Sequence, residues 1–127
     1  LKNKFINELS GGQSQRAFLA MTIAQNTNIL LLDEPTTFLD INYQIRFLES
    51  LKKLIKLKKL SIITVLHDIN LAARFCDRIA ILKEGKLIDI NTPKKVLNKE
   101  NFKRGFEIDS HIIDTPFGMQ IFPVGKI

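Results

Sequence analysis

Two adjacent carboxylates, Asp33 and Glu34, directly follow the aliphatic run Ile29–Leu32. An unbroken run of this kind is typical of a strand buried on both faces of a parallel sheet, and such sheets bind ligands at the carboxyl ends of their strands. Phosphoryl transfer to water requires a Mg²⁺ ion to neutralise phosphate charge and a group to orient the attacking water. The pair therefore predicts a metal ligand, Asp33, beside a water-orienting residue, Glu34. The alternative is a strand end that only enters a turn.

A second group of residues with chemical potential lies in LSGGQSQR, residues 9–16. Ser10, followed three residues later by Gln13, has the pattern of a capping box at the start of a helix. Gly11 and Gly12 would let a phosphate approach the free backbone N–H groups at the positive end of that helix. Helix capping alone accounts for Ser10 and Gln13 but does not require both glycines, so the segment predicts an anion site.

LSGGQ followed by ILLLDEP resembles the signature motif and the Walker B strand of the ATP-binding-cassette (ABC) ATPases. PTTFLD, which ends at Asp40, resembles the D-loop of that family. His67, directly after the apolar run SIITVL, resembles the switch histidine that contacts the terminal phosphate. A single histidine at a strand end is otherwise more often structural. The second histidine, His111, matches no motif and is predicted to be a surface residue.

The resemblance implies an ATPase that uses ATP and Mg²⁺ and works only as a head-to-tail pair of subunits. Ser10–Gln13 would then serve the partner's nucleotide, whereas Asp33, Glu34 and His67 would serve the chain's own, and Asp40 would lie at the dimer seam. Opening and closing of the pair would drive membrane permease subunits, which an extracytoplasmic substrate-binding protein supplies. The expected location is the cytoplasmic face of the cell membrane.

The elements that would position these residues alternate between helix and strand as far as Phe75, which predicts an α/β fold with a mostly parallel sheet flanked by helices. The predicted elements are a helix over 9–26, a strand over 29–32, a helix over 42–59, a strand over 61–66, a helix over 69–75, two short strands around Glu84-Gly85, a small helix that begins at Pro93, and a terminal hairpin over 111–124. By resemblance, residues 1–98 form the C-terminal half of a P-loop NTPase domain of the ABC type, and residues 99–127 form a small hairpin appendage.

One part of the family pattern is missing from the chain. No G-x-x-x-x-G-K-[ST] loop occurs, so the lysine and the amides that cradle the β- and γ-phosphates are absent from these residues. The chain also begins at Leu1, which predicts a fragment whose missing parts lie upstream. As written, the polypeptide is expected not to hydrolyse ATP.

Composition restricts the other interpretations. A single cysteine, Cys76, favours a reducing compartment, and no apolar run approaches the roughly 20 residues of a membrane-spanning helix. The net charge of +6 is concentrated in KKLIKLKK, whose lysines fall largely on the wet face of an amphipathic helix. A nucleic-acid contact through these lysines, in a soluble ABC ATPase acting on DNA or ribosomes, is one alternative, and a non-catalytic interaction fragment is another. The lysines concerned are Lys52, Lys53, Lys56 and Lys59.

The second half of the chain carries a narrower resemblance. TVLHDINLAARFCDRIAILKEGKLI, followed by TPKKVLNKENFKRGFEI, is similar to the ATPases of importers for ferric siderophores, haem and cobalamin. The aromatic residue before Leu-Asp in PTTFLD and the ending FGMQIFPVG agree with this subgroup. The resemblance implies iron-chelate or cobalamin import, although no residue here would contact the cargo.

Overall fold

The computed structural model describes residue 5, residue 9 and residues 11–126. Contacts within the chain divide it into two compact units, residues 1–67 and residues 68–127. The first unit holds every residue that the sequence predicts to act on ATP, and each unit is described by itself. The predicted boundary between residues 1–98 and 99–127 stays a prediction.

The first unit alternates helix and strand as predicted. It consists of α1 (Gly11–Ala24), β1 (Ile29–Leu32), α2 (Ile41–Lys58) and β2 (Ser61–Thr64). The strands pair in parallel, with Ile29 opposite Ser61 and Leu32 opposite Thr64. Parallel pairing requires a crossover connection, and α2 provides it. The predicted order of elements and the parallel sheet are confirmed.

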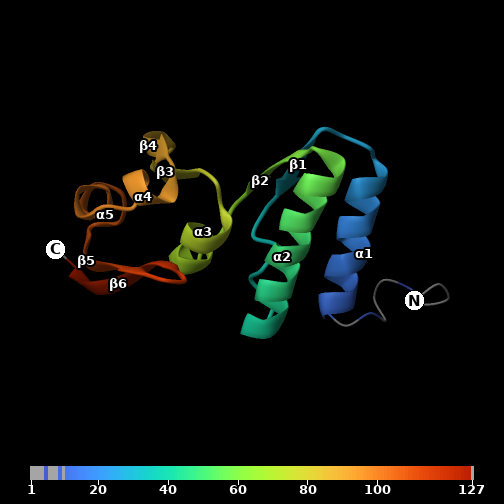
Figure 1. Cartoon of the computed structure of the whole chain (residues 1–127), viewed down its shortest axis with the longest axis horizontal. Helices are drawn as coiled ribbons and strands as arrows, with labels where there is room; N and C mark the ends of the chain where they lie inside the picture. Colours follow the sequence, from blue (N-terminus) through green and yellow to red (C-terminus); the bar gives the residue numbers. More distant parts are fainter. Residues whose placement is uncertain (1–4, 6–8, 10, 127) are drawn as a thin grey trace. The chain divides into compact units, whose positions relative to one another are not determined.

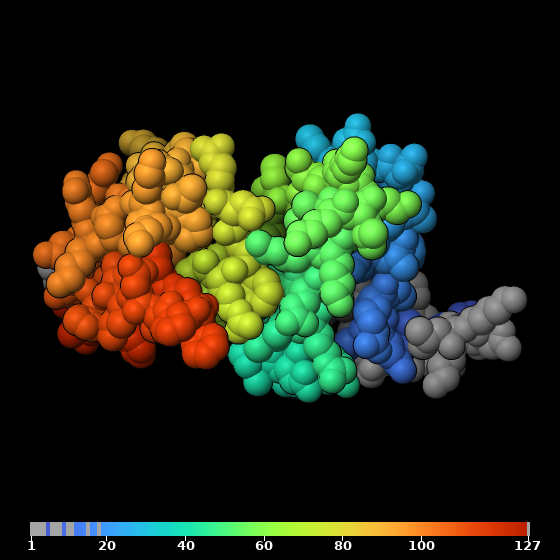
Figure 2. Space-filling model, viewed as in Figure 1, coloured from blue at the N-terminus to red at the C-terminus, as the bar shows by residue number. Residues whose placement is uncertain are grey.

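Helices α1 and α2 lie alongside each other and run in the direction opposite to β1 and β2 (Figure 1). On the face shown in Figure 2, side chains of α1, in blue, pack along those of α2, in green. Because the helices and the strands run in opposite directions, the carboxyl ends of both strands lie at the end of the unit where both helices begin. The predicted glycine pair and the predicted carboxylates therefore lie at the same end of this unit (Figure 1).

Helix α2 has a defined start and stop. Asp40 caps its first turn, where a side-chain oxygen accepts a hydrogen bond from the Tyr43 N–H at 3.1 Å. Lys59 ends the helix with a left-handed backbone, φ 53°. The apolar side of the helix buries Phe47, Leu48 and Leu51. On the opposite side Lys53, Lys56 and Lys59 are exposed, as the solvated-face interpretation predicts.

The expectation that β1 is buried on both faces is wrong for this segment. Leu30 is only 4% exposed, but its neighbour Leu31 is 69% exposed. Ile63 on β2 points to the open face with Leu31 and is 62% exposed. The reason is that the sheet of the first unit has only two strands, and side chains that alternate along them have helices on one side alone.

The second unit packs three short helices around two hairpins. Its elements are α3 (Ile69–Phe75), β3 (Ile79–Lys83), β4 (Lys86–Asn91), α4 (Pro93–Val96), α5 (Lys99–Phe106), β5 (Ile108–Thr115) and β6 (Gly118–Lys126). Both strand pairs are antiparallel, so one of the three two-stranded sheets among the described residues is parallel. The hairpin around Glu84-Gly85 and the helix that begins at Pro93 are confirmed. Helix α5 was not predicted, and the terminal hairpin is longer than predicted.

The core of the second unit joins residues from four elements. Ile81, Val96, Leu97, Phe102 and Ile121 are each at most 3% exposed. Because these residues come from β3, α4, α5 and β6 and from the turn after α4, the terminal hairpin packs into the same core as the β3–β4 hairpin.

Polar contacts tie further parts of this unit together. The Asn70 side chain of α3 bonds the backbone of Ile121 in both directions, at 2.7 and 3.2 Å. Lys83 pairs with Glu107, and this hydrogen bond, together with the lysine charge, lowers the pKa of the Glu107 carboxyl. In the part of the chain that the structure describes, no helix has both the length and the apolar character that crossing a membrane requires.

Candidate functional site

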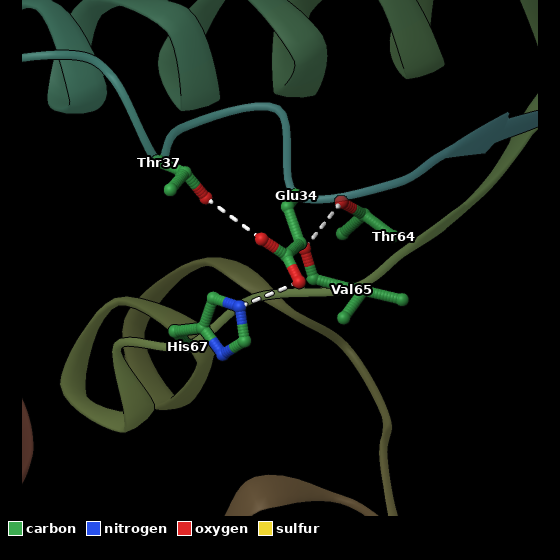
Figure 3. A network of polar contacts seen from close by, with 5 residues as sticks. All are labelled: Glu34, Thr37, Thr64, Val65 and His67. Atoms are coloured by element: carbon green, nitrogen blue, oxygen red, sulfur yellow. Dashed lines mark hydrogen bonds and ion pairs between the residues drawn. The ribbon is translucent and has the colours of Figure 1, made fainter.

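The strand ladder brings Glu34 and His67 together. Leu32 lies opposite Thr64, and the Val65 N–H continues the pairing by donating to the Leu32 carbonyl at 3.0 Å. Because both strands end at this edge, the residues that follow them enter the same space. Glu34 is the second residue after β1 and His67 is the third after β2, and the two side chains meet there (Figure 3).

Both carboxylate oxygens of Glu34 are held. The Nε2 atom of His67 lies 2.7 Å from Oε1, and the Thr37 hydroxyl donates to Oε2 at 3.2 Å. Figure 3 shows the carboxylate between these two groups. The His67 and Glu34 side chains are 68% and 43% exposed, so the carboxylate remains open to water and to a ligand while its orientation is fixed from two sides.

The backbone of Glu34 is in an unusual conformation. Its φ is 44°, in the left-handed region that residues with a Cβ seldom adopt. A turn over Glu34–Thr37 follows, in which the Thr37 N–H donates to the Glu34 carbonyl at 3.3 Å and Pro35 occupies the second position. The turn is also attached to α2, because the Gln44 side-chain amide donates to the Thr36 carbonyl at 3.0 Å. Thr36 is buried and Gln44 is half-buried, so this hydrogen bond is partly buried.

Asp33 is exposed at the carboxyl end of β1, next to Glu34. Its donor chemistry fits Mg²⁺, which is usually held by one or two carboxylates and completes its shell with water and phosphate oxygens. Among the described residues, no group of three or more histidine, cysteine, aspartate or glutamate side chains could form a closed metal site. Asp33 could therefore contribute a single ligand to an ion that a bound phosphate chain also holds.

Helix α1 begins at Gly11, as the glycine pair predicts. Ser10, its predicted cap, lies outside the described residues. A Cβ added at Gly12 would meet nothing within 4 Å. Packing within this chain therefore does not require glycine at residue 12, and the open space there agrees with close approach by a ligand. Gln13 follows in the first turn and is half-buried.

The start of α1 and the loop after Glu34 line one cavity. It has a volume of about 230 Å³ and lies between α1 and α2. Gly12, Arg16 and Leu19 line it from α1, and Leu39 and Tyr43 line it from the D-loop segment and the start of α2. The cavity places the predicted signature segment beside the predicted D-loop segment. Asp40, at the end of that loop, is exposed and caps α2, and its predicted place at a dimer seam stays a prediction.

Sequence reasoning missed two residues that support Glu34. Thr37 has a recognisable signal, because the turn that Pro35 favours returns the chain toward Glu34 and carries the Thr37 hydroxyl with it. Gln44 has no comparable signal. A glutamine in the first turns of a helix is common, and only the folded loop places the Thr36 carbonyl within reach of this one.

A family model described as "ABC transporter" matches residues 1–37. Among characterised proteins, the chain is 51% identical over 108 residues to a petrobactin import ATP-binding protein of Bacillus anthracis, covering 84% of this chain and 40% of that protein. It is 44% identical over 128 residues to the ferric enterobactin transport ATP-binding protein of Escherichia coli K12, covering 99% of this chain and 47% of that protein. The chain therefore spans less than half the length of each of these relatives.

Solved structures agree with these sequence matches. A metal-chelate type ABC transporter in an inward-facing conformation superposes with a TM-score of 0.82 at 24% identity, over 94% of this chain and 49% of that one. A dimeric, post-hydrolysis state of the ATP-binding cassette MJ0796 with ADP and phosphate superposes with a TM-score of 0.61 at 40% identity, over 68% of this chain and 37% of that one. The fold is that of part of a P-loop NTPase domain.

Proposed function

This chain belongs to the ABC transporter ATP-binding family, and from that premise we propose that it is the C-terminal half of an ATP-hydrolysing motor subunit. The observation that carries the proposal is the carboxylate of Glu34, fixed between Thr37 and His67 at the carboxyl end of a parallel strand. At that position a carboxylate can accept a hydrogen bond from a water molecule and orient it toward a terminal phosphate.

Each residue of the proposed site has a distinct part. Glu34 orients the attacking water through its exposed carboxylate. His67 holds that carboxylate through Nε2, and its proposed second role is to contact the terminal phosphate. Asp33 binds the Mg²⁺ ion, which supplies charge neutralisation at the phosphate oxygens when it is bound. No lysine-bearing phosphate loop occurs in these residues, and since the chain spans less than half the length of the relatives named above, the proposed activity is that of a longer protein.

A second subunit completes the proposed site. Backbone N–H groups at the start of α1, around Gly11 and Gly12, suit a phosphate that approaches along the helix axis. Open space at Gly12 supports this role, because a ligand could approach the backbone without displacing a side chain. We place Ser10–Gln13 against the nucleotide of the partner subunit and Asp40 at the seam between the two, with permease subunits attached on the cytoplasmic face of the membrane.

The proposed cargo is an iron chelate of the siderophore type. Support comes from the relatives, since the two named above carry petrobactin and ferric enterobactin in their names. Another relative, 39% identical over 80% of this chain, is a cobalamin import ATP-binding protein of Halobacterium salinarum. Uptake of a radiolabelled ferric siderophore by cells that lack the full-length gene tests this assignment. Unimpaired uptake of every ferric chelate tried, with loss of cobalamin uptake, would exclude the iron-chelate assignment.

The ATPase proposal is tested by Glu34→Gln in the full-length protein. The amide keeps the size of the side chain but cannot orient water as a carboxylate does, so phosphate release should fall at least about a hundredfold. Binding of ATP, measured by titration calorimetry, should stay within about threefold of the original. Glu49→Gln, an equal change of charge at an exposed residue of α2, serves as the control and should leave both measurements unchanged. Hydrolysis by Glu34→Gln near the original rate would remove Glu34 from the site.

A further inference from the structure

Resting on the proposed function, we infer that Thr37 is a positioning residue that sets the orientation of the Glu34 carboxylate for water activation. The Thr37 hydroxyl is the donor to Oε2, the oxygen that His67 leaves unoccupied, at 3.2 Å. A carboxylate accepts hydrogen bonds at both oxygens, so a donor on each one restricts rotation about the terminal torsion of the side chain.

The geometry of the turn explains why the hydroxyl is available. Thr37 is the fourth residue of the turn that begins at Glu34, and its backbone N–H bonds the Glu34 carbonyl at 3.3 Å. Thr37 therefore contacts Glu34 twice: its N–H donates to the Glu34 carbonyl, and its hydroxyl donates to the Glu34 carboxylate. With φ at 44°, Glu34 has a backbone conformation that its own side chain does not favour, and these contacts support it.

The loop that carries Thr37 is itself held to a rigid element. Gln44 of α2 bonds the carbonyl of buried Thr36, and Leu39 donates to that same carbonyl at 3.2 Å. The turn that carries the Thr37 hydroxyl is therefore held in place by two hydrogen bonds to the Thr36 carbonyl. Precise placement matters at such a site, because small errors in the position of a water-activating group cost large factors in rate.

Two substitutions at Thr37 separate the effect of its hydroxyl from the effect of its branched shape. Thr37→Val keeps the branched shape and removes the donor, and in the full-length protein it should lower kcat for ATP hydrolysis about tenfold. KM for ATP should stay within about twofold, because Thr37 acts through Glu34 and not on the nucleotide. Thr37→Ser restores the donor and should recover most of kcat. Thr27→Val is the matched control, since the Thr27 hydroxyl bonds the Ile29 carbonyl at the other end of β1 and should not affect the rate.

A double-mutant cycle with Glu34→Gln tests whether Thr37 acts through Glu34. In a single-turnover assay, Thr37→Val should leave the low rate of the Glu34→Gln protein unchanged, because the carboxylate that Thr37 positions has been removed. A further tenfold loss in that background would show that Thr37 acts elsewhere and would overturn the inference. So would a rise in KM with unchanged kcat in Thr37→Val alone, or a Thr37→Ser protein no better than Thr37→Val.

Failure of this inference is distinguishable from failure of the proposed function. If Glu34→Gln collapses hydrolysis but Thr37→Val does not, the motor assignment stands and only the positioning role is lost. If Glu34→Gln itself hydrolyses ATP normally, the water-orienting role of Glu34 fails first and the positioning role fails with it. Thr37 is exposed, so the loss of its hydroxyl should not disturb the core, and equal thermal midpoints for Thr37→Val and Thr37→Ser check this point.

Discussion

At the scale of single residues, the 2.7 Å contact between His67 and Glu34 allows the predicted role of the histidine to be tested directly. His67→Ala in the full-length protein removes the group that holds Oε1 of Glu34 and that is proposed to contact the terminal phosphate. We expect kcat for ATP hydrolysis to fall at least about tenfold, with ATP binding retained. Steady-state phosphate release and calorimetric titration measure the two effects.

His111 provides the control for this change. It is exposed on β5 in the second unit and has no predicted role, so His111→Ala should leave hydrolysis unchanged. Equal rates for the two alanine variants would return His67 to a structural role.

Candidate site residues are easiest to find in the sequence where a chemical step requires a particular type of side chain. Asp33, Glu34 and His67 could be singled out because carboxylates at one strand end and a histidine at the next suit phosphate chemistry, and their roles stay predictions. Thr37 and Gln44 could not, because hydroxyls and amides form hydrogen bonds in many places. Only the folded turn decides which carbonyl or carboxylate they reach.

At the scale of elements, the left-handed residue at the end of α2 gives a stability prediction. Lys59 has φ 53° and ψ 37°, a conformation in which its Cβ is crowded by the backbone. Lys59→Gly relieves this crowding and should raise the free energy of unfolding by about 0.5–1 kcal/mol, measured by urea denaturation of the full-length protein. Lys58→Gly, one residue earlier and still helical, should lower it by about 0.5–1 kcal/mol. The same sign for both changes would contradict the observed end of the helix.

A second element-scale prediction concerns the packing of α5 against β3. A Cβ added at Gly105 would lie 2.7 Å from Cγ2 of Ile81, a buried and β-branched side chain that cannot swing away. Alanine favours a helix over glycine by about 1 kcal/mol, whereas overpacking of a core costs about 1–3 kcal/mol, so the steric effect should prevail. Gly105→Ala should therefore lower the urea midpoint of the full-length protein.

The neighbouring residue of the same helix gives the comparison for Gly105. Arg104 is exposed, and Arg104→Ala should leave the midpoint nearly unchanged. A higher midpoint for Gly105→Ala than for the original protein would mean that α5 does not pack on β3 as described.

Most elements of the chain could be predicted, and the exception has a physical reason. The strands contain apolar runs and the long helices contain apolar residues at helical spacing, and both patterns can be recognised in the sequence. Helix α5, KENFKRGF, spans only eight residues and contains Gly105, which weakens its signal, although Phe102 and Phe106 recur at the i, i+4 spacing of a helix and could have indicated it. It forms because Asn98 caps its first turn and Phe102 is buried in the core of the second unit, and burial of this kind is a tertiary effect.

At the scale of the whole molecule, the first unit has large apolar side chains that are open to water. Leu31 and Ile63 are largely exposed on the open face of the β1–β2 sheet, and Phe38 in the loop before α2 is 95% exposed. Leu31 and Ile63 lie opposite each other on paired strands, and adjacent exposed apolar side chains of this kind are typical of an interaction site. The apolar run predicted burial on both faces, and in this structure nothing covers the face that carries Leu31 and Ile63.

We propose that the glycine-bearing start of α1 and the carboxylates that follow β1 form two walls of a phosphate pocket shared between two copies of the chain. Analytical ultracentrifugation of the full-length Glu34→Gln protein tests it most directly, because blocked hydrolysis should trap the ATP-bound pair. We predict that the Glu34→Gln protein sediments at twice the monomer mass with ATP and as a monomer with ADP. When Gly12→Glu is added, a negative side chain lies at the start of α1, and the protein should stay a monomer with ATP. A protein that binds ATP tightly yet stays monomeric, or a pair that forms equally well with Gly12→Glu, would show that the two copies do not share such a pocket.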